Sequence, residues 1–222
     1  MLGGISQRSP FVLIPFITTD PDRAQPLDAA EFERQLRANA HAYHNYHAFN
    51  VLLNTGRASP HQMRGWVANR FYYQSHIPRG DAALDPWLRL GEAVGLCANE
   101  LWSTEHVLPA VRTAVNSYVA LTQQQPWQEG VCASLTELFA AEITGSQIAS
   151  WPAYYPWIDA AGLEYFRSQM HLTQQDIDHR LQVTLEFFTS RDAQLRALEL
   201  LRLKLDLLWC VLDAIECGYG RS

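Results

Sequence analysis

One lysine lies on the apolar face of the helix that the C-terminal sequence predicts. Leu201 precedes Lys204, and Leu208 and Val211 follow it, at spacings that place their side chains on one helical face. A buried ammonium group is costly unless a carboxylate or an anionic ligand neutralises it. Lys204 is therefore either a candidate ligand for an anion or a lysine at the edge of the helix whose charged end reaches solvent.

A second polar group belongs to a helix predicted further upstream. Arg70, Tyr73 and Gln74 alternate there with Trp66 and Phe71. Spacings of three and four residues place Arg70 and Tyr73 beside Trp66 on one face. Such a face indicates either the wall of a binding pocket or a structural hydrogen-bond network.

Three histidines, His41, His44 and His47, occur three residues apart, which resembles a stripe of metal ligands. A di-iron bundle normally carries two Glu-x-x-His motifs, and none occurs in this sequence. The nearest match is Asp176 with His179. We therefore expect no metal site, and we expect one histidine to face inward as an acid or base while the others are solvated.

A carboxylate, Glu137, lies between Ser134 and Ala141 on a face of small residues, which leaves room for a ligand beside it. The alternative is a structural partner for an arginine or lysine. The sequence contains neither a glycine-rich phosphate loop nor a G-x-S-x-G nucleophile motif.

Length and composition limit the class of protein. The chain has 222 residues, of which 48% are hydrophobic, and these proportions are typical of one globular domain. Its net charge of -6 argues against a nucleic-acid partner, and no apolar run reaches the length of a membrane span. The cysteines form no CxxC pair, which favours small buried thiols and a cytoplasmic location. They are Cys97, Cys132, Cys210 and Cys217.

The elements that position these side chains are predicted to be helices. Residues 1–27 should form an irregular extension and residues 28–219 a single domain of an all-α bundle. The first helix should begin near Asp28 and carry apolar positions as far as Tyr43. Leu135 and Leu138 should continue a helix opened by Pro126, and Trp151–Trp157 should be a loop. Further helices are expected to begin near Ser59, Asp85 and Thr173, and others to include Val107–Tyr118, Leu163–Met170 and Leu198–Ile215.

Several ordered strings make the chain similar to the PqqC family, whose members close the ring system of pyrroloquinoline quinone (PQQ). They are WVANRFYYQ at 66–74, WLRLGEAVGL at 87–96, SLTELFA at 134–140, SWP followed by YPWIDAAG at 150–162, and KLDLLW with LDA at 204–214. The resemblance covers roughly residues 28–219. Because these motifs are long and occur in the same order, they are more specific than one short pattern.

The resemblance implies a compact haem-oxygenase-like helical bundle that forms a homodimer. It implies no metal and no organic cofactor, with O2 as co-substrate. The family reaction is ring closure of a small polycarboxylate quinone precursor and its oxidation by O2, which yields PQQ and hydrogen peroxide. The electron-rich substrate itself reduces O2, so the protein supplies binding, orientation and proton transfer.

The resemblance also assigns site residues. It places His44, Tyr73, Glu137, Tyr165 and Lys204 among the catalytic groups. It places Tyr43, Arg70, Gln74, Tyr118 and Thr136 among the groups that bind substrate.

This chain departs from the family pattern in its pocket. Leu84 leads almost directly to Trp87, where the family has a longer segment that carries a pocket arginine and a histidine. The remaining departures are Gly80 for a lysine, Thr144 for a histidine, and Gln147 and Gln169 for arginines. Each charge-assisted hydrogen bond contributes about 1.5–3 kcal/mol, so these losses weaken the hold on a polycarboxylate. An alternative function is therefore a catalytically impaired bundle that binds PQQ, its precursor or a pathway partner.

Overall fold

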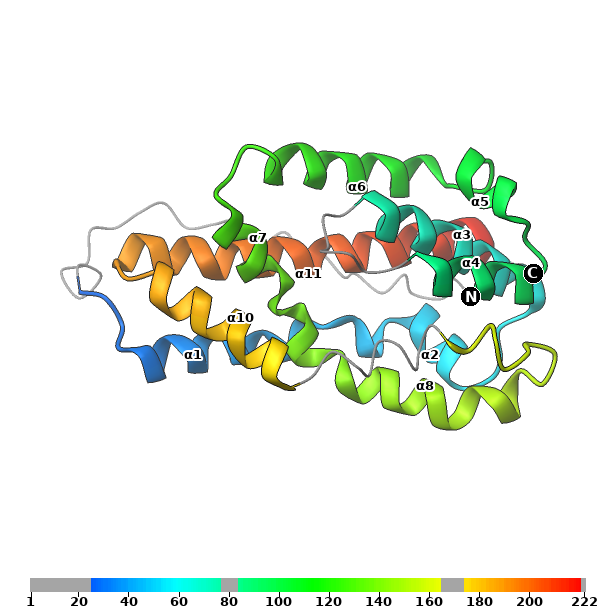
Figure 1. Cartoon of the computed structure of the whole chain (residues 1–222), viewed down its shortest axis with the longest axis horizontal. Coiled ribbons are helices and arrows are strands. Elements are labelled where there is room, and N and C mark those ends of the chain that lie inside the picture. Colours follow the sequence, from blue (N-terminus) through cyan, green and yellow to red (C-terminus); the bar gives the residue numbers. More distant parts are fainter. Residues whose placement is uncertain (1–24, 77–83, 165–173, 221–222) are drawn as a thin grey trace, which may run out of the picture.

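The fold is built around one long helix, α11 (Arg191–Tyr219), which runs through the middle of the molecule (Figure 1). The computed structural model describes residues 25–76, 84–164 and 174–220, apart from the side chains at 141–144, 146, 148 and 174. Within these ranges every regular element is a helix and no β-strand occurs, so the expected all-α class is confirmed. The extension expected over residues 1–27 lies almost entirely outside the described residues.

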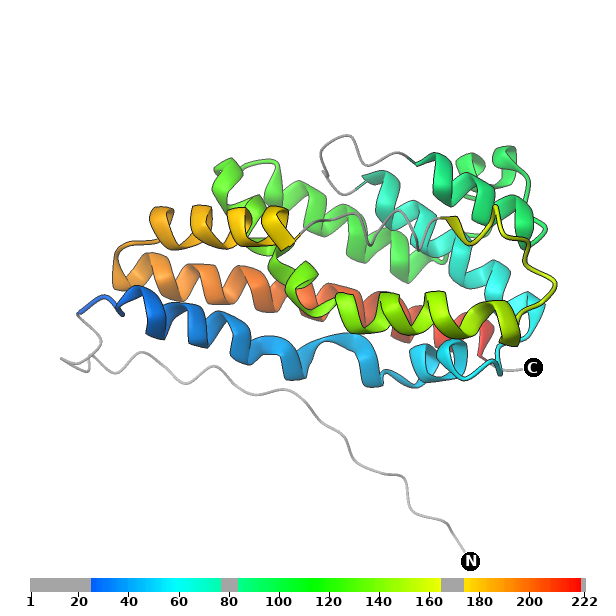
Figure 2. The same cartoon turned by 60° about the horizontal axis from the view of Figure 1, so that its bottom comes forward.

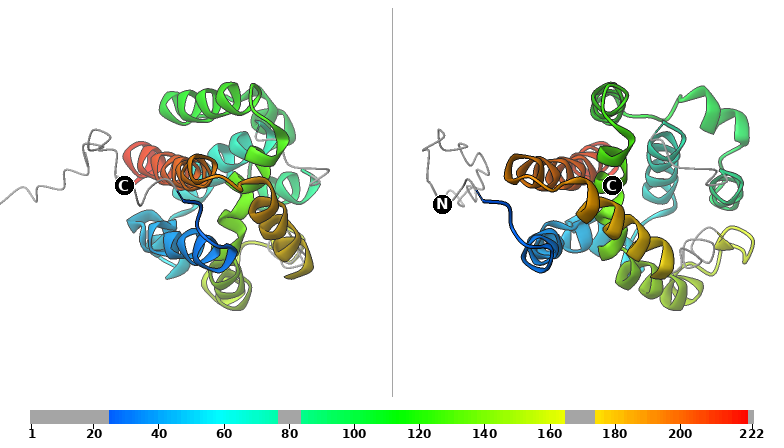
Figure 3. Two further views of the ribbon diagram at one scale, coloured as in Figure 1. Left: turned by 90° about the vertical axis from the view of Figure 1, so that its left-hand side faces the viewer. Right: turned by 60° about the vertical axis from the view of Figure 1, so that its left-hand side comes forward.

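Ser190 is the N-cap of α11, and its hydroxyl accepts a hydrogen bond from the Ala193 N–H. Its apolar face, which includes Leu201, Leu205 and Val211, is fully buried. Helices α6 (Pro109–Thr122) and α1 (Ala29–Arg37) cover α11 on different sides, as the view along the bundle shows (Figure 3). Because so many elements pack on α11, a polar residue on its buried face meets side chains from several helices.

Helix α3 (Pro60–His76) begins where the capping signals predict. The Ser59 hydroxyl accepts from the Gln62 N–H at 3.3 Å, and the Gln62 side-chain oxygen accepts from the Ser59 N–H at 2.8 Å. The helix is buried on most of its circumference between α4 (Asp85–Ala93), α6 and α11. Such an enclosed helix can present polar side chains only to partners or to an internal site.

The first helix is shorter than predicted. Helix α1 ends at Arg37 and is followed by two 3-10 helices, η2 (Ala38–Ala42) and η3 (His44–Tyr46), and then by α2 (Ala48–Asn54). The Asn39 side chain donates to the carbonyls of Gln35 and Leu36, which gives the end of the helix local partners. Tyr43 then adopts an extended backbone conformation. The helical spacing assumed for the three histidines therefore does not hold.

The remaining described elements differ from expectation at two places. Helix α8 (Ala141–Tyr154) continues with Pro152 inside it through half of the segment expected to be a loop. Trp151 is fully buried there, and its packing offsets the lost helical hydrogen bond. Leu135 and Leu138 lie in a 3-10 helix, η4 (Ser134–Phe139), and not in an α-helix. The other elements are α5 (Ala98–Ser103), α7 (Trp127–Ala133) and α10 (Gln174–Phe187).

The segment after residues 77–83 is integrated into the core. Trp87 of α4 is 2% exposed, and its ring centroid lies 5.7 Å from that of Trp66 in α3. Trp66 in turn lies 5.7 Å from Trp151 of α8. These three indoles join α3, α4 and α8, and Figure 2 shows α8 at the same end of the bundle as α3 and α4. No helix in the described ranges combines the length and apolar character needed to cross a bilayer.

Candidate active site

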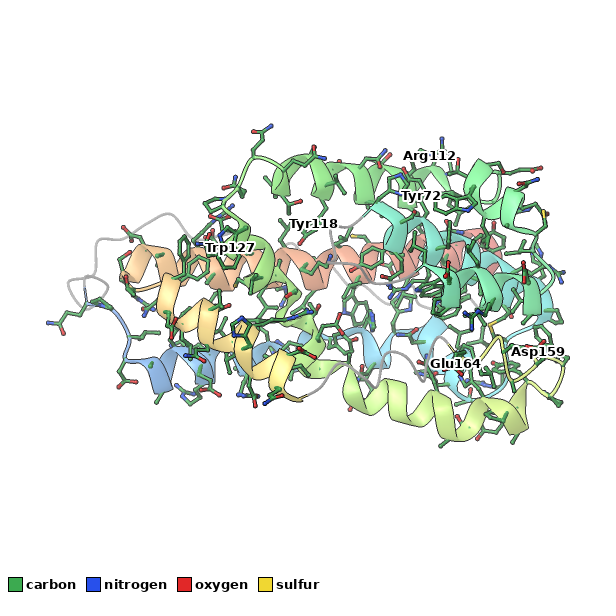
Figure 4. The ribbon with its side chains drawn as sticks, in the orientation of Figure 1. Tyr72, Arg112, Tyr118, Trp127, Asp159 and Glu164 are labelled. Atoms are coloured by element: carbon green, nitrogen blue, oxygen red, sulfur yellow. The ribbon has the colours of Figure 1, made fainter. Side chains whose placement is uncertain are left out.

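Two tyrosine rings surround the ammonium group of Lys204, which is buried with 3% exposure on α11. Its Nζ lies 4.2 Å from the centroid of Tyr118 and 4.8 Å from that of Tyr73. Tyr118 lies on the side of α6 that faces α11 (Figure 4). Aromatic faces attract cations without removing their charge, so the ammonium group of Lys204 remains positively charged at this buried position. The 3% exposure of Lys204 excludes the alternative of a helix-edge lysine whose charged end reaches solvent.

A second cation from another helix shares the Tyr73 ring. The guanidinium carbon of Arg70 lies 4.6 Å from the Tyr73 centroid. Its Nη1 is buried and has no hydrogen-bond partner among the described residues. A buried guanidinium nitrogen without a hydrogen bond costs free energy, and an anionic ligand would supply the missing acceptor. The geometry therefore indicates a site for an anionic ligand at Tyr73.

The neutral imidazole of His44 belongs to the same site. His44 is 8% exposed, and its ring centroid lies 4.3 Å from that of Tyr43. Burial, with smaller contributions from the charges of Arg70 and His47, lowers the pKa of His44 from 6.5 to about 3. At neutral pH this ring is uncharged and acts as a hydrogen-bonding group.

The 3-10 helix η4, which carries Glu137, lies next to the pair formed by Tyr43 and His44. The Tyr43 ring lies 5.9 Å from that of Phe139 in η4, and η4 packs against α11. Thr136 is buried in η4 and Glu137 is half-buried. Glu137 also takes part in an interaction within the protein. The same segment thus supplies both the hydroxyl and the carboxylate that the sequence indicated.

Only some of the other predicted site residues lie within the described parts of the structure. Gln74 is buried on α3, one position after Tyr73, and Gln147 is buried on α8. Both side chains are neutral, so they add no positive charge to the site. Outside the described parts of the structure lie Tyr165, Gly80, Gln169 and the side chain of Thr144.

The histidines differ from expectation, because two of them are buried. His41 is exposed, whereas His47 is only 2% exposed. Nδ1 of His47 accepts a hydrogen bond from the Phe49 N–H at 3.1 Å and caps α2. The proton of the neutral ring is therefore on Nε2, which donates to Asp213 at 3.0 Å. The irregular backbone around Tyr43 turns both buried rings inward.

His47 also belongs to the only group in the described ranges whose ligand atoms are close enough to hold a metal ion. Its ring nitrogen and the carboxylates of Asp213 and Glu216 lie within 4.8 Å of one another. A metal on Nε2 would place a proton on Nδ1, where the Phe49 N–H already points. Ligation would thus disrupt the cap of α2, so the geometry favours a hydrogen bond over a metal centre.

Asn50 was missed by reasoning from the sequence. Its side-chain nitrogen lies 3.2 Å from Nδ1 of His44 and donates to the His44 carbonyl at 2.9 Å. Both residues are buried. Their separation of six residues matches no helical spacing, and only the turn through η3 brings them together. No local signal in the sequence pointed to this contact.

Several known proteins with similar sequences are pyrroloquinoline-quinone synthases. A pyrroloquinoline-quinone synthase of Pseudomonas putida (strain W619) is 45% identical over 226 residues, covering 88% of this chain and 90% of the relative. The synthase of Pseudomonas aeruginosa (strain LESB58) is 45% identical over 223 residues, covering 87% and 89%. That of Pseudomonas entomophila (strain L48) is 44% identical over 226 residues, covering 88% and 90%.

These alignments confirm that the chain is shortened internally. The first spans 226 positions but includes only 88% of the 222 residues here, so roughly thirty positions of the relative have no counterpart. A model of the TENA/THI-4/PQQC family matches this chain in two segments, residues 33–85 and 82–214. The break falls between α3 and α4, where the sequence motifs indicated a missing segment. The resemblance, the helical fold and the extent of these matches agree: the chain belongs to the TENA/THI-4/PQQC family.

Proposed function

We propose that this protein is a pyrroloquinoline-quinone synthase, an oxidoreductase that uses O2 for the final ring closure and oxidation in PQQ biosynthesis. The names of relatives that are 44–45% identical over most of the chain support this reaction. The observation that carries the proposal is the arrangement of Arg70 and Lys204 around Tyr73. It joins two cations and an aromatic surface within one buried region.

This arrangement matches the chemistry of the substrate class. A polycarboxylate quinone is flat, aromatic and anionic. Guanidinium and ammonium groups bind carboxylates through charge-assisted hydrogen bonds, and tyrosine rings pack against flat ring systems. Tyr118 extends the aromatic surface beyond Lys204. We therefore assign Arg70 and Lys204 to the carboxylates of the precursor, with Tyr73 and Tyr118 beside its rings.

In this reaction the substrate supplies the electrons and O2 accepts them. The protein holds the precursor, excludes water and moves protons. We assign these proton and hydrogen-bonding roles to His44, Tyr73, Glu137 and Tyr165, with Tyr43, Gln74 and Thr136 positioning the substrate. We propose that neither a metal nor an organic cofactor takes part, and the hydrogen-bonded state of His47 is consistent with this.

We further propose that the protein works as a homodimer in the cytoplasm. The dimer follows from the family resemblance. The cytoplasmic location is supported by the cysteines, because Cys97, Cys132, Cys210 and Cys217 are all free thiols in the structure.

A second candidate function is favoured by the internal shortening. The missing segment and the neutral Gln147 reduce the number of cations available to the substrate. A bundle that retains Arg70 and Lys204 but has lost proton-transfer groups would bind PQQ, its precursor or a pathway partner without turnover. Binding without oxidation is therefore the expected behaviour of this alternative.

The experiment that separates the two functions mixes purified full-length protein with the quinone precursor in air. Synthase activity predicts PQQ absorbance that appears together with O2 uptake and hydrogen peroxide. The binding-only alternative predicts saturable binding of PQQ by calorimetry with no O2 uptake. Folded protein that neither binds PQQ nor consumes O2 would contradict both proposals.

A further inference from the structure

The side-chain amide of Asn50 has a fixed orientation. The peptide carbonyl of His44 can only accept hydrogen bonds, and it lies 2.9 Å from the Asn50 side-chain nitrogen. The amide must therefore direct its NH2 group toward this carbonyl, because the alternative orientation would bring two oxygens together. Both residues are buried, so water does not readily replace this contact.

The same NH2 group determines which nitrogen of His44 carries the proton. It has two hydrogens, and Nδ1 of His44 lies 3.2 Å from it. With one hydrogen directed to the carbonyl, the other faces Nδ1, which must then present its lone pair. The neutral ring consequently carries its proton on Nε2. A doubly protonated ring would direct an N–H of Nδ1 toward another donor.

Nε2 of His44 is left available to a ligand. It makes no hydrogen bond with any of the described residues, whereas Nδ1 faces Asn50. The His44 ring lies against Tyr43, which in turn contacts η4, the segment that carries Glu137. The charge of Arg70, the cation that we assign to a substrate carboxylate, also acts on this ring. A neutral imidazole with its proton on Nε2 donates a hydrogen bond and cannot accept a proton at that atom.

We propose that Asn50 is a positioning residue, which fixes His44 as the neutral tautomer with its proton on Nε2 and makes it a hydrogen-bond donor to an oxygen of the bound substrate. The identity of the substrate rests on the proposed function, whereas the tautomer does not. In this role His44 stabilises negative charge that develops on the oxygen during ring closure or oxidation. It does not act as the general base.

The tautomer is measured by long-range 1H–15N correlation NMR on histidine-labelled full-length protein, with His44→Gln identifying the signals of His44. The wild type should show a protonated Nε2 and an unprotonated Nδ1, without titration between pH 5 and 8. Asn50→Asp should move the proton to Nδ1, because its carboxylate accepts where the amide donated. Asn50→Leu should leave a mixture of tautomers.

Asn39→Asp is the matched control, because the Asn39 amide also donates to backbone carbonyls but does not face a histidine. It should leave the His44 signals unchanged. With the quinone precursor, Asn50→Leu should lower kcat about a hundredfold with a smaller change in KM, as expected for loss of a group that acts in the transition state.

Two results would overturn the inference: a wild-type His44 protonated on Nδ1, or folded Asn50 variants that both retain the wild-type tautomer. Either result would leave PQQ synthesis itself unaffected. Conversely, the protein could show the expected tautomers but no turnover. That result would reject the synthase function, and it would still support the role of Asn50 in setting the tautomer.

Discussion

Nζ of Lys204 lies 4.8 Å from the centroid of the Tyr73 ring, although the two residues are separated by 131 positions in the chain. Lys204 reaches this ring from α11, and Arg70 approaches it from α3. The ring thus brings together cations from two helices. Its aromatic face and its hydroxyl should contribute to different steps, which substitutions can separate.

Tyr73→Leu removes the aromatic face and should weaken PQQ binding about three- to thirtyfold, since cation–π contacts contribute about 0.5–2 kcal/mol. Tyr73→Phe keeps the face and should preserve affinity while lowering kcat about a hundredfold, because the proton-carrying hydroxyl is lost. Calorimetry measures the first effect and O2 uptake the second. Equal loss of affinity in both variants would contradict this division of roles.

The buried neutral state of His44 makes stability depend on pH. Its pKa is about 3 in the folded protein and 6.5 ordinarily, so between these values the unfolded chain binds more protons. Stability should be greatest above pH 6.5 and fall as the pH drops toward 3. From pH 7 to 4.5 this one group should lower the free energy of unfolding by roughly 2–3 kcal/mol.

Urea unfolding at both pH values measures this contribution. His44→Gln should reduce the loss of stability between pH 7 and 4.5, whereas the exposed His41→Gln should retain the wild-type loss. If His44→Gln and the wild type lose the same free energy of unfolding, His44 does not carry the depressed pKa.

Helix α4, which follows the shortened segment, packs closely against Gly162. A Cβ placed on Gly162 would collide with the Cβ of Ala93 at the end of α4. Gly162→Ala should therefore lower the free energy of unfolding by about 1–3 kcal/mol. Gly130→Ala is the control, because a Cβ there meets no atom within 4 Å, and it should stabilise α7 by about 0.5–1 kcal/mol. A neutral effect at Gly162 would show that α4 packs differently.

Both ring nitrogens of His47 are engaged in hydrogen bonds, so we expect that the protein does not need a metal ion. Prolonged treatment with a strong chelator should leave PQQ formation unchanged, and elemental analysis after growth with added iron or manganese should find no stoichiometric metal. Restoration of activity by one metal ion after chelation would show instead that the protein has a functional metal site.

Local signals in the sequence predicted the start of α3 well, because the cap between Ser59 and Gln62 depends only on neighbouring residues. The long and regular stripe of leucines in α11 also placed Lys204 on the apolar face, but only the structure shows that its charged end is buried. The orientation of His47 and the role of Asn50 could not be predicted, because the backbone leaves the helical conformation between α1 and α2.

The convergence of Lys204, Arg70 and Tyr118 is a tertiary relationship, and helical spacing within each segment carries no information about it. The resemblance to the family supplied this grouping at the sequence level. The packing of α3 and α6 on α11 explains it physically, because all three helices direct buried polar side chains toward the same region.

The most direct test of the account is the affinity for PQQ, measured by calorimetry, of the wild type, Arg70→Met, Lys204→Met and the double variant. Arg202→Met is the control, because Arg202 lies on the exposed face of α11 and pairs with Asp206. Each single change should weaken binding about ten- to a hundredfold, and the double change should abolish measurable binding, whereas the control should bind as the wild type does. A folded double variant that binds PQQ with wild-type affinity would contradict the account.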